Sequence, residues 1–134
     1  MYALFRESVA PPEFMARSSA PQFRGENPSV APAELNERWV SGAQILYFGR
    51  ARGPGVRSLL KQRVKRFLRF GHGRVVAHWG GRFVWQLRDA SALRVAWKIT
   101  GDQDPMRTEG RLQKRFLERY GRPPFANVEE ETEE

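Results

Sequence analysis

A phenol, a guanidinium and a carboxylate, each set among apolar residues, are the side chains of this sequence best suited to chemistry. Tyr47 lies in the apolar stretch 45–49, two residues before the glycine that ends it. Helical periodicity puts Arg63 on the apolar side of a basic helix, and Glu109 begins the apolar stripe of a later helix. Since burying an unpaired charge is costly, each charged group should meet an opposite charge there. The three side chains together suggest chemistry on a phosphate.

Each of these residues also has a purely structural interpretation. Arg63 could form a structural ion pair or lay its apolar stem along the edge of the stripe. Glu109 lies near a helix N-terminus, where the helix dipole favours negative charge, and it could pair with Arg63. Tyr47 could be a core residue with a solvated hydroxyl. The two histidines, His72 and His78, could accept a proton near neutral pH or could be ordinary loop residues.

The charge distribution indicates a polyphosphate partner. The stretch from Arg38 through Arg88 contains twelve Lys or Arg residues, both ends included, and no Asp or Glu. Such a run favours nucleic acid, because cations that neutralise phosphates release condensed counterions. Five glutamates in the last six residues lower the formal net charge to +8. The cations that we expect to contact nucleic acid are Arg50, Arg57, Lys61, Lys65, Arg66, Arg69 and Arg74.

Composition excludes several other classes. The chain has no cysteine, so a disulfide framework and a thiolate zinc site are both impossible. No apolar run approaches the roughly 20 residues of a membrane span, and the N-terminus lacks the features of a secretory signal. We therefore expect a cytoplasmic protein without a membrane partner, and the sequence leaves its oligomeric state open.

The elements that must position these residues follow an α/β pattern. Turn signals and periodicity predict helices from residue 32 to about 40, from 56 to 70 and from 105 to 120. Strands are predicted at 45–49 and 93–99; on the first, period two puts Ile45, Tyr47 and Gly49 on one face. The alternation over 83–87 favours another strand, although a short helix fits almost as well.

The two ends of the chain show no sustained periodicity. Residues 1–28 hold four prolines and are predicted to be a partly disordered or loosely docked arm. Residues 129–134 are predicted to be a solvated acidic tail. A single domain is therefore expected over residues 29–128.

Four motifs in order resemble those of the GIY-YIG nuclease superfamily. They are Leu46-Tyr47-Phe48-Gly49-Arg50, then Arg63 in a basic helix, then Glu109, then Pro124-Phe125-Ala126-Asn127. The resemblance covers about residues 25 to 128 and is closest to small bacterial members with a basic helix, a Gly-Gly-Arg segment and a closing Pro-Phe-Ala-Asn.

The resemblance implies a small central antiparallel sheet of about three strands flanked by helices, with a phosphodiesterase site that uses Mg²⁺ or Mn²⁺. By this similarity Tyr47 orients the attacking water or the phosphate, and Arg63 stabilises charge on the phosphate. Glu109 holds the metal, and Asn127 closes the site. The chain departs from the family pattern in the first half-motif. No tyrosine occurs between Tyr2 and Tyr47, although the family's first tyrosine is a favoured candidate for the proton acceptor.

Two functions follow as hypotheses. The first is a divalent-metal-dependent endonuclease acting on DNA, in which Tyr47 itself or His78 could replace the missing tyrosine as proton acceptor. The alternative is a catalytically degenerate module on the same scaffold that binds nucleic acid through its basic face. A weaker possibility assigns protein interactions to the proline-containing arm, or has the acidic tail mask the basic face.

Overall fold

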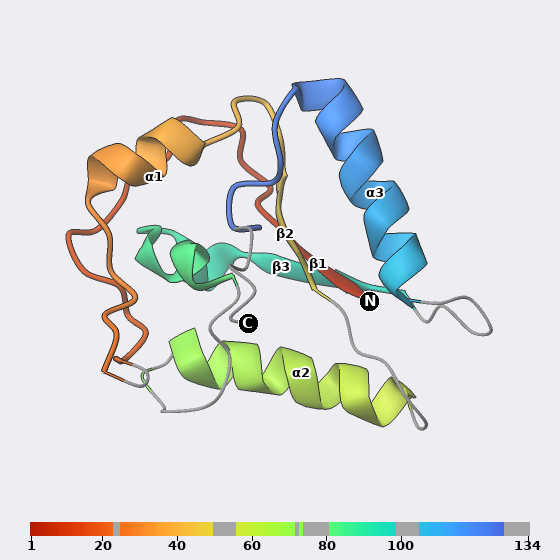
Figure 1. Cartoon of the computed structure of the whole chain (residues 1–134). Helices are drawn as coiled ribbons and strands as arrows, with labels where there is room; N and C mark the ends of the chain where they lie inside the picture. Colours follow the sequence, from red (N-terminus) through yellow and green to blue (C-terminus); the bar gives the residue numbers. More distant parts are fainter. Residues whose placement is uncertain (23–24, 50–55, 72, 74–80, 99–104, 128–134) are drawn as a thin grey trace.

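Residues 1–22, 25–49, 56–71, 73, 81–98 and 105–127 are described in a computed structural model of the chain (Figure 1). At positions 56–60, 63, 70, 105 and 106 only the backbone is described. Within these ranges, none of the helices is long and apolar enough to cross a membrane.

The centre of the fold is an antiparallel sheet of three short strands. They are β1 (Tyr2–Phe5), β2 (Ile45–Gly49) and β3 (Arg94–Trp97), and β1 lies in the middle, in the order β2-β1-β3. The predicted α/β class with a small central antiparallel sheet is therefore confirmed.

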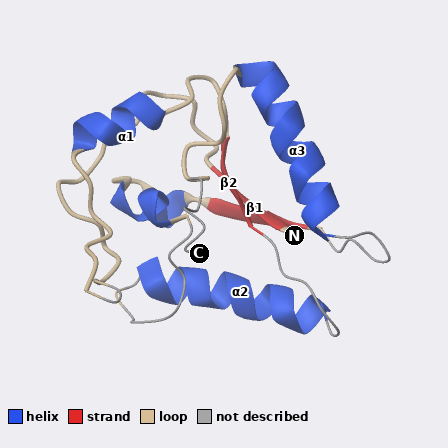
Figure 2. Cartoon of the chain, in the orientation of Figure 1, coloured by secondary structure: helices blue, strands red, loops and turns tan. Residues whose placement is uncertain are grey.

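In the described part of the chain, three helices surround the sheet: α1 (Pro32–Arg38), α2 (Val56–Gly71) and α3 (Pro105–Tyr120). Two 3-10 helices, η1 (Arg82–Gln86) and η2 (Ala90–Ala92), precede β3. Helices α2 and α3 lie on either side of the sheet (Figure 2). Val64 of α2 packs against Tyr2, whereas Phe116 of α3 belongs to the cluster around Phe48. The sheet is therefore covered on both faces.

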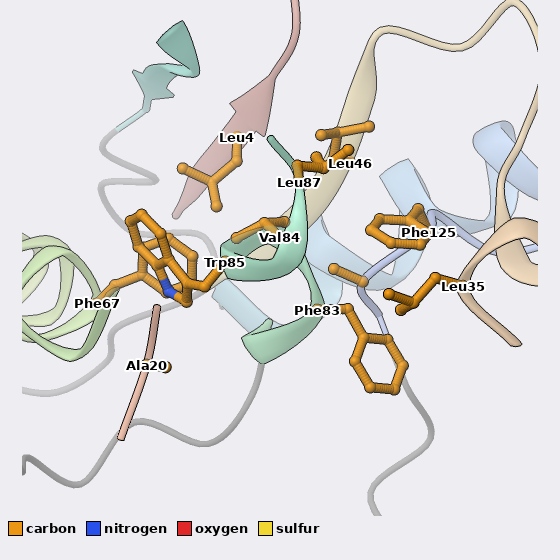
Figure 3. Close-up of a cluster of buried hydrophobic side chains, with 11 residues drawn as sticks. Leu4, Ala20, Leu35, Leu46, Phe67, Phe83, Val84, Trp85, Leu87 and Phe125 are labelled. Carbon is orange, nitrogen blue, oxygen red and sulfur yellow. The ribbon is translucent and has the colours of Figure 1, made fainter. Parts of the chain in front are cut away.

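The main core fills the space between the sheet, α2, η1 and the loop that follows α3. Its buried members are Leu4, Ala20, Leu35, Leu46, Phe67, Phe83, Val84, Trp85, Leu87, Phe125 and Ala126 (Figure 3). The residues of η1 supply the centre of this cluster, and the ring of Phe67 lies 4.8 Å from that of Trp85. Gly71 allows this contact, because a Cβ there would lie 2.2 Å from the Trp85 ring.

The expectation that residues 1–28 form a loose arm is wrong. Residues 2–5 are the central strand of the sheet, so the domain does not begin at residue 29. Residues 13–19 run along η1, where Met15 N donates to Gln86 O and Ser19 N donates to Trp85 O. The buried Gln86 side chain also donates to Met15 O and Val30 O and accepts from Val30 N. These hydrogen bonds hold residues 13–19 against η1, although that segment has no regular spacing of apolar residues.

Two local expectations also require correction. The alternation over 83–87 does not form a strand, because residues 82–86 are the 3-10 helix η1, the less favoured alternative. Phe83, Val84, Trp85 and Gln86 are all buried, so an alternating pattern could not distinguish the two structures. On β2, Leu4 pairs with Tyr47 and Phe5 with Ile45, which leaves Leu46 as an extra residue. This irregularity places Ile45 in the cluster of Phe48 rather than beside Tyr47.

Candidate functional site

Two tyrosines meet on the face of the sheet that α2 covers. Tyr2 of β1 and Tyr47 of β2 have ring centroids 6.0 Å apart. Tyr2 is only 2% exposed and packs against Tyr47, Val64 and Val95. Tyr47 is half-buried, and its ring stacks on Phe67 of α2 at 5.9 Å. A pair of phenols is therefore held between two strands and a basic helix.

Gly49 makes room for the hydroxyl end of Tyr2. The two residues are cross-strand partners. A Cβ placed on Gly49 would lie 2.2 Å from Cζ of Tyr2 and 2.5 Å from its hydroxyl oxygen. The phenol of Tyr2 therefore extends over the backbone at the end of β2. Glycine at position 49 is thus required by the side chain of Tyr2, which comes much earlier in the sequence.

Gly81 performs a similar role for Tyr47. It has φ of 76°, in the left-handed region that favours glycine, and it precedes η1. A Cβ there would lie 2.9 Å from the Phe67 ring and 3.1 Å from Cζ of Tyr47. The backbone at Gly81 therefore lies close to the two stacked rings.

Helix α2 carries position 63 next to this pair. Val64 contacts Tyr2, and Phe67, one turn after position 63, stacks on Tyr47. The backbone of residue 63 is thus on a part of α2 that faces the sheet, while the Arg63 side chain lies outside the described residues. Four cations of the same helix are exposed: Lys61, Lys65, Arg66 and Arg69.

Glu109 lies near the end of the sheet at which β1 begins. It is 8% exposed, and its Oε1 accepts a hydrogen bond of 2.9 Å from Nε2 of Gln113. Burial lowers the pKa of the Met1 amino group, and the Glu109 carboxylate opposes that shift, so the two groups interact. Met1 directly precedes β1, so Glu109 lies near the end of the sheet that carries Tyr2, but its helix α3 packs on the opposite face of the sheet from the tyrosine pair. The predicted burial of Glu109 is confirmed.

The chemistry of Glu109 fits a hard divalent cation held by one protein ligand. In the described ranges, no group of three or more His, Cys, Asp or Glu residues could form a closed metal cage. Mg²⁺ does not need such a cage, since it is commonly bound by one or two carboxylates together with waters and substrate phosphate oxygens. Glu109 would supply the carboxylate, and the cation would supply positive charge for a phosphate.

The side-chain amide of Asn127 forms hydrogen bonds with the backbone of β2. Its Nδ2 donates to Phe48 O at 3.0 Å, and its Oδ1 accepts from Phe48 N at 2.8 Å. The preceding Ala126 N donates to Leu46 O at 2.8 Å. The segment that follows Pro124 therefore covers the outer edge of β2 as a fourth strand would. The Asn127 side chain therefore holds β2, the strand that carries Tyr47, in place.

The remaining sequence-predicted residues lie outside the described part. Arg50, Arg74 and His78 are not described, and neither is the side chain of Arg57. The residue that sequence reasoning missed is Tyr2. Its only signal is the short run Tyr2-Ala3-Leu4-Phe5, which contains two aromatic strand-forming residues. So short a run, followed by a proline-rich segment, is weak as a strand signal.

Comparison with protein-family models found no match to the chain. Comparisons with curated proteins and with solved structures found none either. The functional argument therefore depends on the geometry and chemistry of the residues described above.

Proposed function

We propose that this protein is a divalent-metal-dependent endonuclease that hydrolyses phosphodiester bonds in nucleic acid, with DNA as the expected substrate. The observation that carries the proposal is the pairing of Tyr2 with Tyr47, whose rings lie 6.0 Å apart on neighbouring strands. The resemblance to GIY-YIG nucleases requires a first tyrosine on a strand beside Tyr47. Residues 27–31, where the sequence suggested looking for it, are not a strand, whereas β1 carries a tyrosine next to Tyr47.

The roles follow from the chemistry of each group. In this proposal Tyr2 or Tyr47, as its phenolate, takes the proton of the attacking water and becomes the neutral phenol, while the other phenol orients the water or the phosphate. Arg63 stabilises the negative charge that develops on the phosphate. Glu109 holds Mg²⁺ or Mn²⁺, which supplies further positive charge when it is bound. The exposed cations of α2 contact neighbouring phosphates.

Cleavage assays with and without metal test the proposal. Purified protein with Mg²⁺ or Mn²⁺ should cut at least one of supercoiled, branched and single-stranded DNA, and chelation should abolish cutting. Arg63→Ala should also abolish it without unfolding the protein. Failure to cut any of these forms would contradict the proposal, and metal-independent binding would then favour the alternative of a non-catalytic binding module.

Glu109→Gln isolates the charge of the carboxylate. A glutamine at this position keeps the shape and can still accept the hydrogen bond from Gln113, but it removes the negative charge that a cation needs. We expect cleavage to fall by about a hundredfold or more while DNA affinity and thermal stability stay close to wild type. Glu118→Gln, at an exposed position of the same helix, is the matched control and should cut normally. Equal cleavage rates for the two variants would show that Glu109 is not part of the site.

A further inference from the structure

Trp97 presents a large exposed aromatic surface at the edge of the sheet. It is 69% exposed, the highest fraction among the large apolar side chains that the structure describes as exposed. Its position is nonetheless fixed, because β3 pairs with β1 and Trp97 is the cross-strand partner of Tyr2. An exposed ring on a rigid strand is preorganised for a flat partner, since little backbone freedom is lost when that partner binds.

The row of cross-strand partners places Trp97 beside the candidate site. Gly49, Tyr2 and Trp97 lie opposite one another across the three strands. Directly opposite residues of antiparallel strands point to the same face, so the indole lies on the face that carries the tyrosine pair. Whereas Tyr2 is covered by Val64 of α2, Trp97 on the edge strand is not covered.

Exposed cations lie on the same face of the sheet as Trp97. Helix α2 covers the face that carries Tyr2 and its cross-strand partner Trp97, since Val64 of α2 packs against Tyr2. Lys61 and Lys65 of α2, within one turn of Val64, are exposed. An aromatic ring with cations on the same face is a combination that binds nucleic-acid strands, since the ring stacks on a base and the cations contact phosphates.

We infer that Trp97 is a stacking platform for an unpaired nucleobase next to the phosphate that is cleaved. The inference rests on the proposed function and narrows its substrate class to nucleic acid with unpaired bases, such as single strands, loops or branch points. In a continuous duplex each base face is covered by its neighbours, so the exposed indole would find no ring to stack on. Selection for unpaired bases therefore follows from the position of Trp97.

Fluorescence titration of the full chain in the presence of a chelator tests this inference. Without metal no cleavage takes place, so failure of stacking is measured separately from failure of the nuclease proposal. Oligothymidylate should quench the tryptophan emission of the wild-type protein, and a blunt duplex should quench it much less. Trp97→Phe should lose this quenching yet keep most of the affinity for oligothymidylate, because phenylalanine also stacks.

Trp97→Ala should bind oligothymidylate roughly tenfold more weakly, which corresponds to the loss of one stacked base. Its affinity for the duplex should not change. Leu117→Ala, which removes an exposed apolar side chain from α3, is the matched control and should bind as wild type. The inference is overturned if Trp97→Ala binds oligothymidylate as tightly as wild type, or if it loses affinity for both DNA forms equally. It is also overturned if sedimentation shows that Trp97→Ala dissociates a wild-type dimer, since Trp97 would then serve a protein interface.

Discussion

Gly49 and Tyr2 constrain each other, and this dependence can be measured. Tyr2 is held by Tyr47, Val64 and Val95, so its ring cannot move aside when a methyl group is added at Gly49. We expect Gly49→Ala to lower the free energy of unfolding by about 1–3 kcal/mol, as overpacking does in a filled core. Chemical denaturation measures this change.

Gly110→Ala is the control for that substitution. Gly110 lies inside α3, and a Cβ there meets nothing within 4 Å. Because glycine weakens a helix interior, alanine at this position should raise the free energy of unfolding by about 0.5–1 kcal/mol. The two substitutions should therefore have opposite signs. A stabilised Gly49→Ala protein would mean that Tyr2 does not lie over Gly49.

Buried polar side chains hold in place the segments that show no regular spacing of apolar residues. Arg6 is an example: its Nε donates to Asp89 Oδ2 at 2.8 Å, its Nη1 donates to Ala10 O at 2.6 Å, and its guanidinium lies over the ring of Trp39. Such contacts join β1 and the segment after it to α1 and the 3-10 helices. They connect residues that are far apart in the sequence, so no local sequence pattern predicts them.

Gln86 makes another of these connections. Its fully buried amide forms hydrogen bonds with Met15 O and with both backbone groups of Val30. Gln86→Ala would leave those groups without partners, and we expect it to lower the free energy of unfolding by about 3 kcal/mol. Gln44→Ala removes one exposed hydrogen bond, to Glu7 O, and should cost less than about 1 kcal/mol. Similar losses for the two variants would show that Gln86 does not dock this segment.

The accuracy of the sequence predictions follows from how local each signal is. The helix from Pro105 to Tyr120 and the strand 45–49 were predicted at their observed bounds, since glycine and proline mark their ends. The strand at the N-terminus was missed because its four residues depend on partners forty or more positions away for their hydrogen bonds. The tyrosine pair was missed for the same reason: sequence spacing does not reveal which distant strand lies beside Tyr47.

Charge on the molecular surface determines how the protein should respond to salt. Exposed cations occur on both covering helices, at Lys61, Lys65, Arg66 and Arg69 of α2 and at Arg107, Lys114, Arg115 and Arg119 of α3. The acidic tail lies outside the described residues. Binding to nucleic acid should therefore be largely electrostatic and should weaken steeply as salt is added.

Substitution of two α2 cations provides a quantitative test of this salt dependence. Lys65→Gln combined with Arg69→Gln should make the slope of log affinity against log salt shallower by about 1.8 on duplex DNA, or about 0.9 for each lost phosphate contact. Arg88→Gln is the control, because Arg88 is exposed but is paired with Glu13 at 3.1 Å. An unchanged slope in the double variant would place the nucleic-acid interface elsewhere on the molecule.

Replacement of Tyr2 by phenylalanine tests the central claim most directly. Tyr2→Phe removes one oxygen atom and leaves the ring that packs against Tyr47. If the Tyr2 phenol takes part in proton transfer or orients the reacting groups, metal-dependent cleavage should fall by about a hundredfold or more, with DNA affinity and stability nearly unchanged. Tyr120→Phe, on α3 beside Phe116, should cleave normally. Cleavage by Tyr2→Phe at the wild-type rate would contradict the account.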